Sequence, residues 1–242
     1  MTEKLCNPEQ ERAALRDNLL RVRESIASAC ARAGRREDEV TLLAVSKTVA
    51  PERINQAIEL GVDRIGENRV QEYLGKRDAL LPVEAHLIGH LQTNKVNQIV
   101  GKVAMIQSVD SLHLATALNA AAQKRGLTLD VLAEVNIGGE EAKSGVSPEA
   151  AAEFCAQLQE MPALRLCGLM TVPPISETET EKRKYFSEMC RLFIDIRDKN
   201  RDNKDIHILS MGMSDDFEEA ILEGSTMVRI GSAIFGKRQY NI

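Results

Sequence analysis

The sequence is notable first for several features that it does not have. Its cysteines are odd in number and show no CxxC spacing, so we expect neither a disulfide framework nor a metal site. No block of basic residues occurs, and the net charge is only −5, so a nucleic-acid groove and an anionic membrane surface are not expected as partners. Residues 1–10 are polar and lack the apolar segment of a secretory signal or membrane anchor. We therefore expect a protein of the reducing cytoplasm.

The chain also lacks an obvious domain boundary. No stretch rich in proline, glycine and serine divides the 242 residues, and the most linker-like segment, residues 171–176, is interpreted as a loop between a strand and its helix. We therefore expect a single domain over residues 1–242. A single α/β barrel typically takes roughly 250 residues, so the length suits one.

From residue 40 onward, short apolar runs alternate with helical patterns. The predicted strands cover residues 40–46, 63–66, 84–89, 104–108, 128–136, 164–170, 206–210 and 227–230. The predicted helices between them cover residues 51–60, 70–80, 94–100, 111–125, 148–161, 178–200 and 215–222. Before the first strand, apolar residues recur every three or four positions from Leu15 to Cys30. This period predicts a long amphipathic helix, with Asn7 and Pro8 at its start.

Strict alternation of strands and helices favours a parallel sheet covered by helices. Eight repeats favour closure of that sheet, so the predicted fold is a single-domain α/β protein, a (β/α)8 TIM-type barrel. A doubly wound open sheet is the alternative. Such sheets usually carry a glycine-rich fingerprint after their first strand, whereas this chain has Ser46-Lys47-Thr48-Val49-Ala50 there.

Lys47 lies where the first predicted strand ends. In an α/β barrel, chemistry is found at the carboxyl ends of the strands. A lysine held in a cleft there loses water, its pKa can fall, and the free amine can attack an aldehyde. A solvated lysine at a strand end is the alternative interpretation.

Polar segments also follow other predicted strands. They cover residues 66–69 and 88–95, and a glycine-bearing loop over residues 136–145 is long enough to fold over a ligand or to be a surface loop. The loops after the seventh and eighth strands contain small and hydroxyl residues, as phosphate sites of barrels do. These residues are Gly212, Ser214, Gly231 and Ser232.

A phosphate at these two loops would lie near Lys47, because the eighth strand of a barrel neighbours the first. The segment Ser214-Asp215-Asp216 also resembles an ordinary helix N-cap, which is the alternative to a phosphate site. An aldehyde that carries a phosphate would connect both features. Pyridoxal 5′-phosphate is such a compound, and we predict it as the cofactor.

Several motifs, in this order along the chain, closely resemble the pyridoxal phosphate homeostasis protein family over nearly the full length. They are Ala44-Val45-Ser46-Lys47-Thr48, Gly66-Glu67-Asn68, residues 86–95 (HLIGHLQTNK), residues 210–216 (SMGMSDD) and Val228-Arg229-Ile230-Gly231. One departure is visible. Ala85 precedes His86 where the family usually carries Phe or Trp, and we expect it to alter packing beneath the third strand.

The resemblance implies a fold-type III barrel similar to the amino-terminal domain of alanine racemase, with Lys47 as the internal aldimine. It also implies that Met213, Ser214, Gly231 and Ser232 hold the phosphate, that Asn68 and His90 line the cofactor pocket, and that Arg229 is the partner of the pyridine nitrogen. An arginine there disfavours protonation of the ring and weakens it as an electron sink.

A two-base racemase needs a second acid or base opposite the lysine, typically a tyrosine. Tyr73, Tyr185 and Tyr240 do not follow predicted strands, and the sequence ends soon after the eighth strand. We therefore expect no catalytic residues. The predicted role is a monomeric, non-catalytic protein of vitamin B6 homeostasis, which binds pyridoxal phosphate and releases it to amino acids or to pyridoxal-phosphate-dependent apoenzymes.

Two other functions remain open at this point. The first is a fold-type III enzyme such as an amino-acid racemase, and weak activity of that kind is compatible with the motifs. The second is a barrel that binds another phosphate ester, with Lys47 forming a Schiff base to a sugar. We also hypothesise that Lys143 acts as a second amine that displaces Lys47 during release of the cofactor, although a solvated charge is the simpler interpretation.

Overall fold

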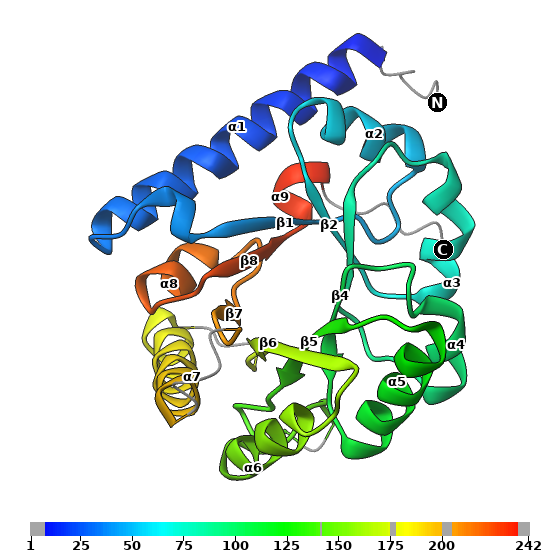
Figure 1. Cartoon of the computed structure of the whole chain (residues 1–242). Helices are drawn as coiled ribbons and strands as arrows, with labels where there is room; N and C mark the ends of the chain where they lie inside the picture. Colours follow the sequence, from blue (N-terminus) through cyan, green and yellow to red (C-terminus); the bar gives the residue numbers. More distant parts are fainter. Residues whose placement is uncertain (1–7, 141, 175–177, 200–204, 237–242) are drawn as a thin grey trace.

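Eight parallel strands form a closed barrel in their sequence order (Figure 1). They were identified in a computed structural model, which describes residues 8–140, 142–174, 178–199 and 205–236. The strands are β1 (Thr41–Val45), β2 (Arg64–Glu67), β3 (Glu84–Leu87), β4 (Met105–Val109), β5 (Leu129–Glu134), β6 (Leu164–Met170), β7 (Ile208–Ser210) and β8 (Met227–Ile230). Because β1 pairs with β8, from Thr41 opposite Met227 onward, the sheet has no open edge there. The predicted barrel is confirmed, and the open sheet is excluded.

Helices follow the strands around the outside of the barrel (Figure 1). They are α1 (Pro8–Arg32), α2 (Pro51–Glu59), α3 (Val70–Lys76), α4 (Val96–Ile99), α5 (Leu112–Arg125), α6 (Pro148–Gln159), α7 (Glu179–Lys199), α8 (Phe217–Leu222) and α9 (Ser232–Phe235). Local signals set several ends. The Ser111 hydroxyl accepts a hydrogen bond from Leu114 N at 3.3 Å at the start of α5, and Gly126, with φ +64°, ends that helix in the left-handed region.

Helices near the predicted positions are shorter or more broken than the sequence pattern indicates. The predicted helix over residues 70–80 is α3 followed by a 3-10 turn, Arg77–Ala79. The predicted helix over residues 94–100 is a 3-10 turn, Thr93–Lys95, followed by α4. The four-residue α9 was not predicted, because so short an element has no apolar period to detect.

Helix α1 packs against α2, α8 and α9 beside the junction of β1 and β8 (Figure 1). Its apolar stripe is buried as the three-to-four spacing predicts, with Leu15, Leu19, Val22 and Cys30 all nearly inaccessible. The helix therefore covers the seam where the barrel closes. Asn7, expected as its N-cap, lies outside the described residues.

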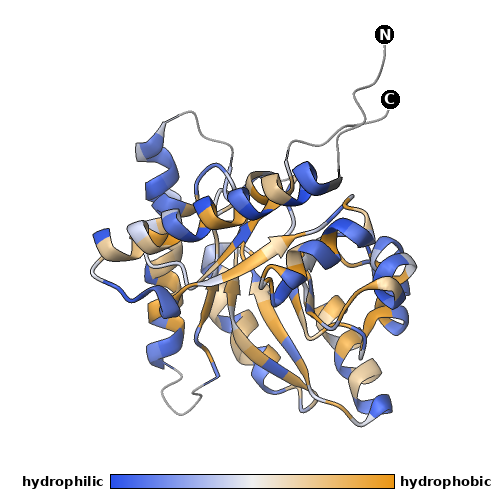
Figure 2. Cartoon of the chain, turned by 90° about the horizontal axis from the view of Figure 1, so that it is seen from above, coloured by the Kyte–Doolittle hydropathy of each residue, from blue (hydrophilic) through white to orange (hydrophobic). Residues whose placement is uncertain are grey.

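The hydrophobic core lies mainly between the barrel and its helices. Figure 2 shows hydrophobic residues along the strands and hydrophilic residues on the outer faces of the helices. A second, small apolar cluster consists of Met105, Leu132, Cys167 and Met170. Ala85 is buried in β3, opposite Ile65 of β2.

Polar side chains occupy part of the barrel interior. Gln107 of β4 accepts a hydrogen bond from Ser210 of β7 at 2.7 Å, and these two strands are not neighbours in the sheet. A contact between them must therefore cross the interior. Among the described helices, none combines the length and the apolar character that a bilayer crossing requires.

Candidate functional site at the carboxyl ends of the strands

A cavity of about 300 Å³ lies where β1, β2, β7 and β8 end, within the size range of small-ligand sites. Its lining residues are Val45, Lys47, Asn68, Ile88, Val172, Met213, Ser214, Asp215, Arg229, Gly231 and Ser232. Seven of the residues predicted from the sequence are therefore brought together, although they come from four separate parts of the chain. They are Lys47, Asn68, Met213, Ser214, Arg229, Gly231 and Ser232.

Lys47 lies just beyond the end of β1 and is half-buried. It lines the 300 Å³ cavity and also an adjoining cavity of about 240 Å³ on the side of α2 and α9. The next residue, Thr48, has φ +65°, a left-handed conformation that is uncommon for a β-branched residue. Such strain persists only where the surroundings hold it, and it is frequent at ligand sites.

A cluster of charged side chains around the buried Lys76 holds the backbone on both sides of Lys47. Lys76 Nζ lies 2.6 Å from Glu67 Oε1 and 3.1 Å from Glu72 Oε1, and it donates a hydrogen bond to Ser46 O at 2.9 Å. The Ser46 hydroxyl donates to Glu67, and Thr48 N donates to the Glu72 carboxylate. Burial raises the pKa of Glu67, while Lys76 and Ser46 oppose the rise. This Lys76 cluster therefore fixes the direction in which Lys47 leaves the strand.

Ser214 connects the loops that follow β7 and β8. Its hydroxyl oxygen accepts hydrogen bonds from Gly231 N at 3.2 Å and from Ala233 N at 3.4 Å. The N-cap alternative is met in part, because Asp216 of this segment occupies the N-cap position of α8, although its side chain makes no capping hydrogen bond. Asp216 Oδ1 instead accepts from Met213 N at 2.6 Å and holds the loop that precedes this helix.

Two glycines allow these loops to approach the barrel closely. Gly212 has φ +92°, and a Cβ added there would lie 2.5 Å from Ala220 Cβ. A Cβ on Gly231 would lie 3.2 Å from Val45 O, at the end of β1. Small residues with accessible backbone are the features that allow a phosphate to sit against main-chain N–H groups.

Asn68 contributes a polar atom without a partner. Its Oδ1 is buried and makes no hydrogen bond within the described part of the chain, although the side chain lines the cavity. A buried amide left in this way costs free energy unless a ligand supplies a hydrogen bond. The residue therefore suits a polar ligand in the cavity.

Arg229 is a buried cation that contacts only neutral acceptors. It is 4% exposed, and it donates from Nη1 to Ser210 Oγ at 2.7 Å and from Nη2 to Thr171 O at 2.8 Å. No carboxylate of the described residues forms an ion pair with it. Burial lowers its pKa to about 10, with Asp216 and Glu134 opposing, so it stays charged at neutral pH. Its charge is available to a group inside the cavity.

His90 does not line this cavity. Its side chain is 58% exposed, and its Nδ1 lies 2.9 Å from Asp110 Oδ2 and 3.4 Å from Ser144 Oγ. The structure thus separates His90 from the other seven predicted residues, and its contact with a cofactor stays a prediction. The loop after β3 carries it toward the segment that follows β5.

Lys143 connects two loops. Its Nζ lies 2.5 Å from Glu140 Oε2 and donates to Pro173 O at 3.0 Å, so it joins the segment after β5 to the segment after β6. It does not line the cavity around Lys47. In this arrangement its amine holds the loops in place, and its proposed part in release of the cofactor is a separate step that the contacts do not test.

Glu134, at the end of β5, was not predicted from the sequence. It is 9% exposed, and its Oε2 has no hydrogen-bond partner within the described residues. Burial raises its pKa to about 7; Asp110 adds to the rise, while Arg229 and His90 oppose it. The sequence pattern that could have identified Glu134 is the same as for Lys47: a charged residue lies at the end of an apolar run.

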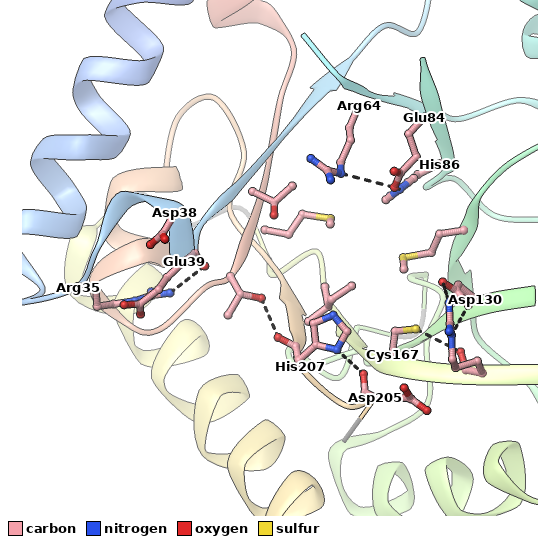
Figure 3. Close-up of a pocket in the computed structure, with 16 residues that line it drawn as sticks. Arg35, Asp38, Glu39, Arg64, Glu84, His86, Asp130, Cys167, Asp205 and His207 are labelled. Carbon is pink, nitrogen blue, oxygen red and sulfur yellow. Dashed lines mark hydrogen bonds and ion pairs between the residues drawn. The ribbon is translucent and has the colours of Figure 1, made fainter. Parts of the chain in front are cut away.

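A larger cavity, of about 580 Å³, lies at the opposite mouth of the barrel, where the strands begin (Figure 3). Each arginine that lines it, Arg35, Arg64 and Arg165, pairs with a carboxylate that also lines it. Arg165 Nη2 lies 2.6 Å from Asp130 Oδ2, and Arg64 Nε lies 3.5 Å from Glu84 Oε1. Because these arginines are already neutralised, the greater volume does not make this cavity the better site for an anionic ligand.

The chain resembles known proteins over most of its length. The family described as alanine racemase, N-terminal domain, matches residues 12–239. The pyridoxal phosphate homeostasis protein of Aquifex aeolicus is 47% identical over 228 residues, which cover 93% of this chain and 98% of that protein.

Two solved structures have a similar fold. A crystal structure of an unknown protein from Bifidobacterium adolescentis superposes with a TM-score of 0.89 at 37% identity, covering 96% of this chain and 98% of that chain. PipY of Synechococcus elongatus PCC7942, with PLP bound, has a TM-score of 0.74 at 30% identity, covering 87% of this chain and all of that one.

Proposed function

The chain belongs to the pyridoxal phosphate homeostasis protein family, and on this premise we propose that it binds pyridoxal 5′-phosphate and takes part in the homeostasis of this cofactor. One observation carries the proposal. A single cavity brings together the Lys47 amine, the unpartnered amide oxygen of Asn68, the Arg229 guanidinium and the small residues of the loops after β7 and β8. These groups match an aldehyde, a ring with polar substituents and a phosphate.

Each residue has a separate task in this proposal. Lys47 is the covalent attachment point, and the Lys76 cluster holds the backbone on either side of it. Met213, Ser214, Gly231 and Ser232 hold the phosphate, and Asn68 contacts a polar substituent of the ring. When bound, pyridoxal phosphate supplies an aldehyde that condenses with an amine, with loss of water, and an electron-withdrawing ring.

Arg229 determines how strongly the pyridine ring can withdraw electrons. A permanently charged guanidinium donates hydrogen bonds and accepts none, so it holds an unprotonated ring nitrogen and disfavours a proton there. The ring is then a weak electron sink. This supports a protein that holds and releases the cofactor to amino acids or apoenzymes, with no catalytic residues of its own.

The four cysteines within the described residues are free thiols, and three of them are buried. Burial raises the pKa of Cys155 to about 12 and that of Cys167 to about 11, so neither is a reactive thiolate at neutral pH. Free thiols of this kind support a reducing cytoplasm as the place of action. We propose that the protein works there as a monomer.

The proposal is tested by titrating the purified protein with pyridoxal phosphate. We expect an absorption band of a covalently held cofactor, which borohydride converts to a stable adduct, and mass analysis of peptides should locate the adduct on Lys47. Lys47→Ala should abolish the band. Lys124→Ala, a lysine of the last turn of α5, is the control and should retain it. A colourless wild-type protein would refute the proposal.

An amino-acid racemase is a second candidate because one observation favours it. Glu134 is a buried carboxyl group at the same barrel mouth with its pKa near 7, as an acid or base needs. The tyrosines do not add support, since Tyr73 is buried with its hydroxyl donating to Lys102 O at 2.8 Å, and neither it nor Tyr185 lines the cavity. Tyr240 lies outside the described residues. Loss of optical rotation from a single enantiomer would distinguish the racemase.

A further inference from the structure

A row of buried polar side chains leads from the cofactor cavity into the barrel interior. It begins at Arg229 of β8, whose Nη1 donates a hydrogen bond to Ser210 Oγ at 2.7 Å. The Ser210 hydroxyl has one proton, and it donates that proton to Gln107 Oε1 of β4 at 2.7 Å. The carbonyl oxygen of the Gln107 amide therefore faces β7, and the amide nitrogen faces the other way.

The row continues to the opposite mouth of the barrel. Gln107 Nε2 lies 2.8 Å from His86 Nδ1 and donates its other proton to Met227 Sδ at 3.1 Å. Because an amide nitrogen can only donate, His86 Nδ1 must accept, and the ring proton is on Nε2. His86 Nε2 lies 2.8 Å from Glu84 Oε1, which accepts that proton. We call these five side chains the interior polar row: Arg229, Ser210, Gln107, His86 and Glu84.

The interior polar row has one consistent direction. Every donor points away from Arg229 and every acceptor points toward it, from the guanidinium at one end to the carboxylate at the other. Gln107 and Ser210 are fully buried, and His86 is 1% exposed, so water cannot readily replace a lost partner. Reversing one group would leave its neighbours with two facing donors or two facing acceptors, which is costly at such burial.

The two ends of the row line different cavities. Arg229 lines the 300 Å³ cavity with Lys47, while Glu84 and His86 line the 580 Å³ cavity, opposite Arg64 (Figure 3). Arg64 Nε lies 3.5 Å from Glu84 Oε1 and adds positive charge at that end. The row thus runs through the barrel and joins both mouths.

We propose that Gln107 and Ser210 are positioning residues that hold the Arg229 guanidinium toward the cofactor, and that His86 sets the direction of the Gln107 amide. The inference rests on the proposed binding of pyridoxal phosphate in the Lys47 cavity. The backbone acceptor Thr171 O holds only Nη2, so Nη1 depends on the row for its place. No carboxylate among the described residues forms an ion pair with Arg229, so the guanidinium is oriented by neutral acceptors.

The first experiment measures the pyridoxal phosphate dissociation constant of Ser210→Ala and Gln107→Met by equilibrium dialysis. Ser210→Ala removes the acceptor of Nη1, and Gln107→Met removes the acceptor that orients the Ser210 hydroxyl. We expect the constant to rise about 10-fold in each, since both weaken the hydrogen bond that holds the charged guanidinium. Ser225→Ala is the matched control. Ser225 is an equally buried serine whose hydroxyl, among the described residues, hydrogen-bonds only to the main-chain oxygens of Leu209, Met211 and Met227. Its variant should bind as the wild type does.

The second experiment uses the protein without cofactor. By ¹⁵N NMR we expect a neutral His86 protonated on Nε2, and slow exchange of the Arg229 Nη protons that becomes faster in Ser210→Ala. Gln107→Glu keeps an oxygen toward Ser210, so it should retain the wild-type affinity within about threefold. It also places an acceptor against His86 Nδ1, so His86 should become doubly protonated. If Ser210 and Gln107 only filled space, exchange of the Arg229 Nη protons would stay slow in Ser210→Ala, and His86 would not gain a second proton in Gln107→Glu.

Wild-type affinity and wild-type Arg229 exchange in folded Ser210→Ala and Gln107→Met would overturn the inference. An equal loss in Ser225→Ala would overturn it as well. If either variant fails to fold, Gln107→Glu and Ser210→Thr are measured in its place, and an unchanged His86 in the former counts against the inference. If the wild type itself binds no pyridoxal phosphate, the proposed function fails, whereas the NMR measurements still decide whether the row orients Arg229.

Discussion

Lys76 and Arg229 are both buried cations near the Lys47 cavity, but their surroundings differ. Lys76 contacts two carboxylates, with Glu67 at 2.6 Å and Glu72 at 3.1 Å. Arg229 contacts a hydroxyl and a main-chain carbonyl and forms no ion pair within the described residues. The first charge is therefore neutralised inside the protein and serves to hold the chain. The second is left for whatever occupies the cavity.

The comparison shows why burial alone does not identify a functional charge. A buried charge is tolerated when it is paired or well hydrogen-bonded. Lys76 meets this condition through protein groups, so it needs no ligand. Arg229 meets this condition only through hydrogen bonds to neutral groups, so a ligand in the cavity would lower the cost of burying its charge. This difference can be tested by substituting the members of each region.

The largest effect is expected for Lys76→Met. The substitution leaves Glu67 buried without its cation, and such losses cost about 3–5 kcal/mol of unfolding free energy. Urea denaturation measures this change. A second substitution in the same chain, Glu67→Gln, removes the stranded charge and should recover part of the loss. If Lys76→Met is as stable as the wild type, the Lys76 cluster does not stabilise the fold and the comparison is wrong.

The next largest effect is expected for Glu134→Gln and depends on pH. Because burial raises the pKa of Glu134 from 4.5 to about 7, the folded state holds its proton more tightly than the unfolded state does. The stability that this proton contributes is present below pH 4.5 and is lost as pH rises to 7. The loss amounts to about 3 kcal/mol relative to the variant.

Urea denaturation of both proteins at several pH values measures this difference. The variant is the control, because every other titrating group is common to the two chains. A difference that stays constant from pH 4.5 to pH 8 would mean that Glu134 is charged at neutral pH. The negative charge of Glu134 would then partly offset the positive charge of Arg229, and Arg229 would differ less from the neutralised Lys76.

A smaller loss of stability is expected for Arg229→Met. Only neutral acceptors lose their donor, so we expect a cost of about 1–2 kcal/mol, less than for Lys76→Met. The cofactor should respond more strongly, because removing the cation lets the ring nitrogen bind a proton. We expect the absorption band of the bound cofactor to change with pH in a range where the wild-type band is constant. A spectrum that Arg229→Met leaves unchanged at every pH would separate Arg229 from the cofactor.

The smallest effect is expected for Lys143→Ala. Its ion pair with Glu140 is partly exposed, and such pairs contribute about 0–1 kcal/mol. Stability should therefore hardly change. Transfer of pyridoxal phosphate to an apoenzyme should slow if Lys143 is the second amine, and Lys124→Ala serves as the control lysine. An unchanged rate of transfer would remove Lys143 from the release step.

Much of the fold could be predicted from the pattern of apolar residues. Strands such as β6, Leu164–Met170, are nearly continuous apolar runs because both faces of a parallel barrel are buried. Element ends were less predictable. The predicted helix over residues 70–80 breaks into α3 and a 3-10 turn just after Gly75, but a single glycine inside a helical pattern does not by itself mark a helix end.

The candidate site was predicted in part. Lys47 could be found because a polar residue that ends an apolar strand has few structural reasons to be there, whereas Arg229 was identified through the family motif Val228-Arg229-Ile230-Gly231. Gln107 and Glu134 carry a similar signal, yet nothing in their own strands indicates a partner. The hydrogen-bond partners of Gln107 lie on β3, β7 and β8, and Glu134 is influenced by the charge of Arg229 on β8, far away in sequence.

The sequence by itself determined the barrel, the position of Lys47 at the end of β1 and the family. Period and motif are local properties, so they can be recognised along one chain. Only the tertiary structure decided that Lys76 is neutralised by ion pairs while Arg229 is not, and that His90 lies away from the cavity. It also decided that Glu134 Oε2 is buried with no hydrogen-bond partner among the described residues. Each of these depends on the distance between side chains from different strands, which closure of the barrel sets.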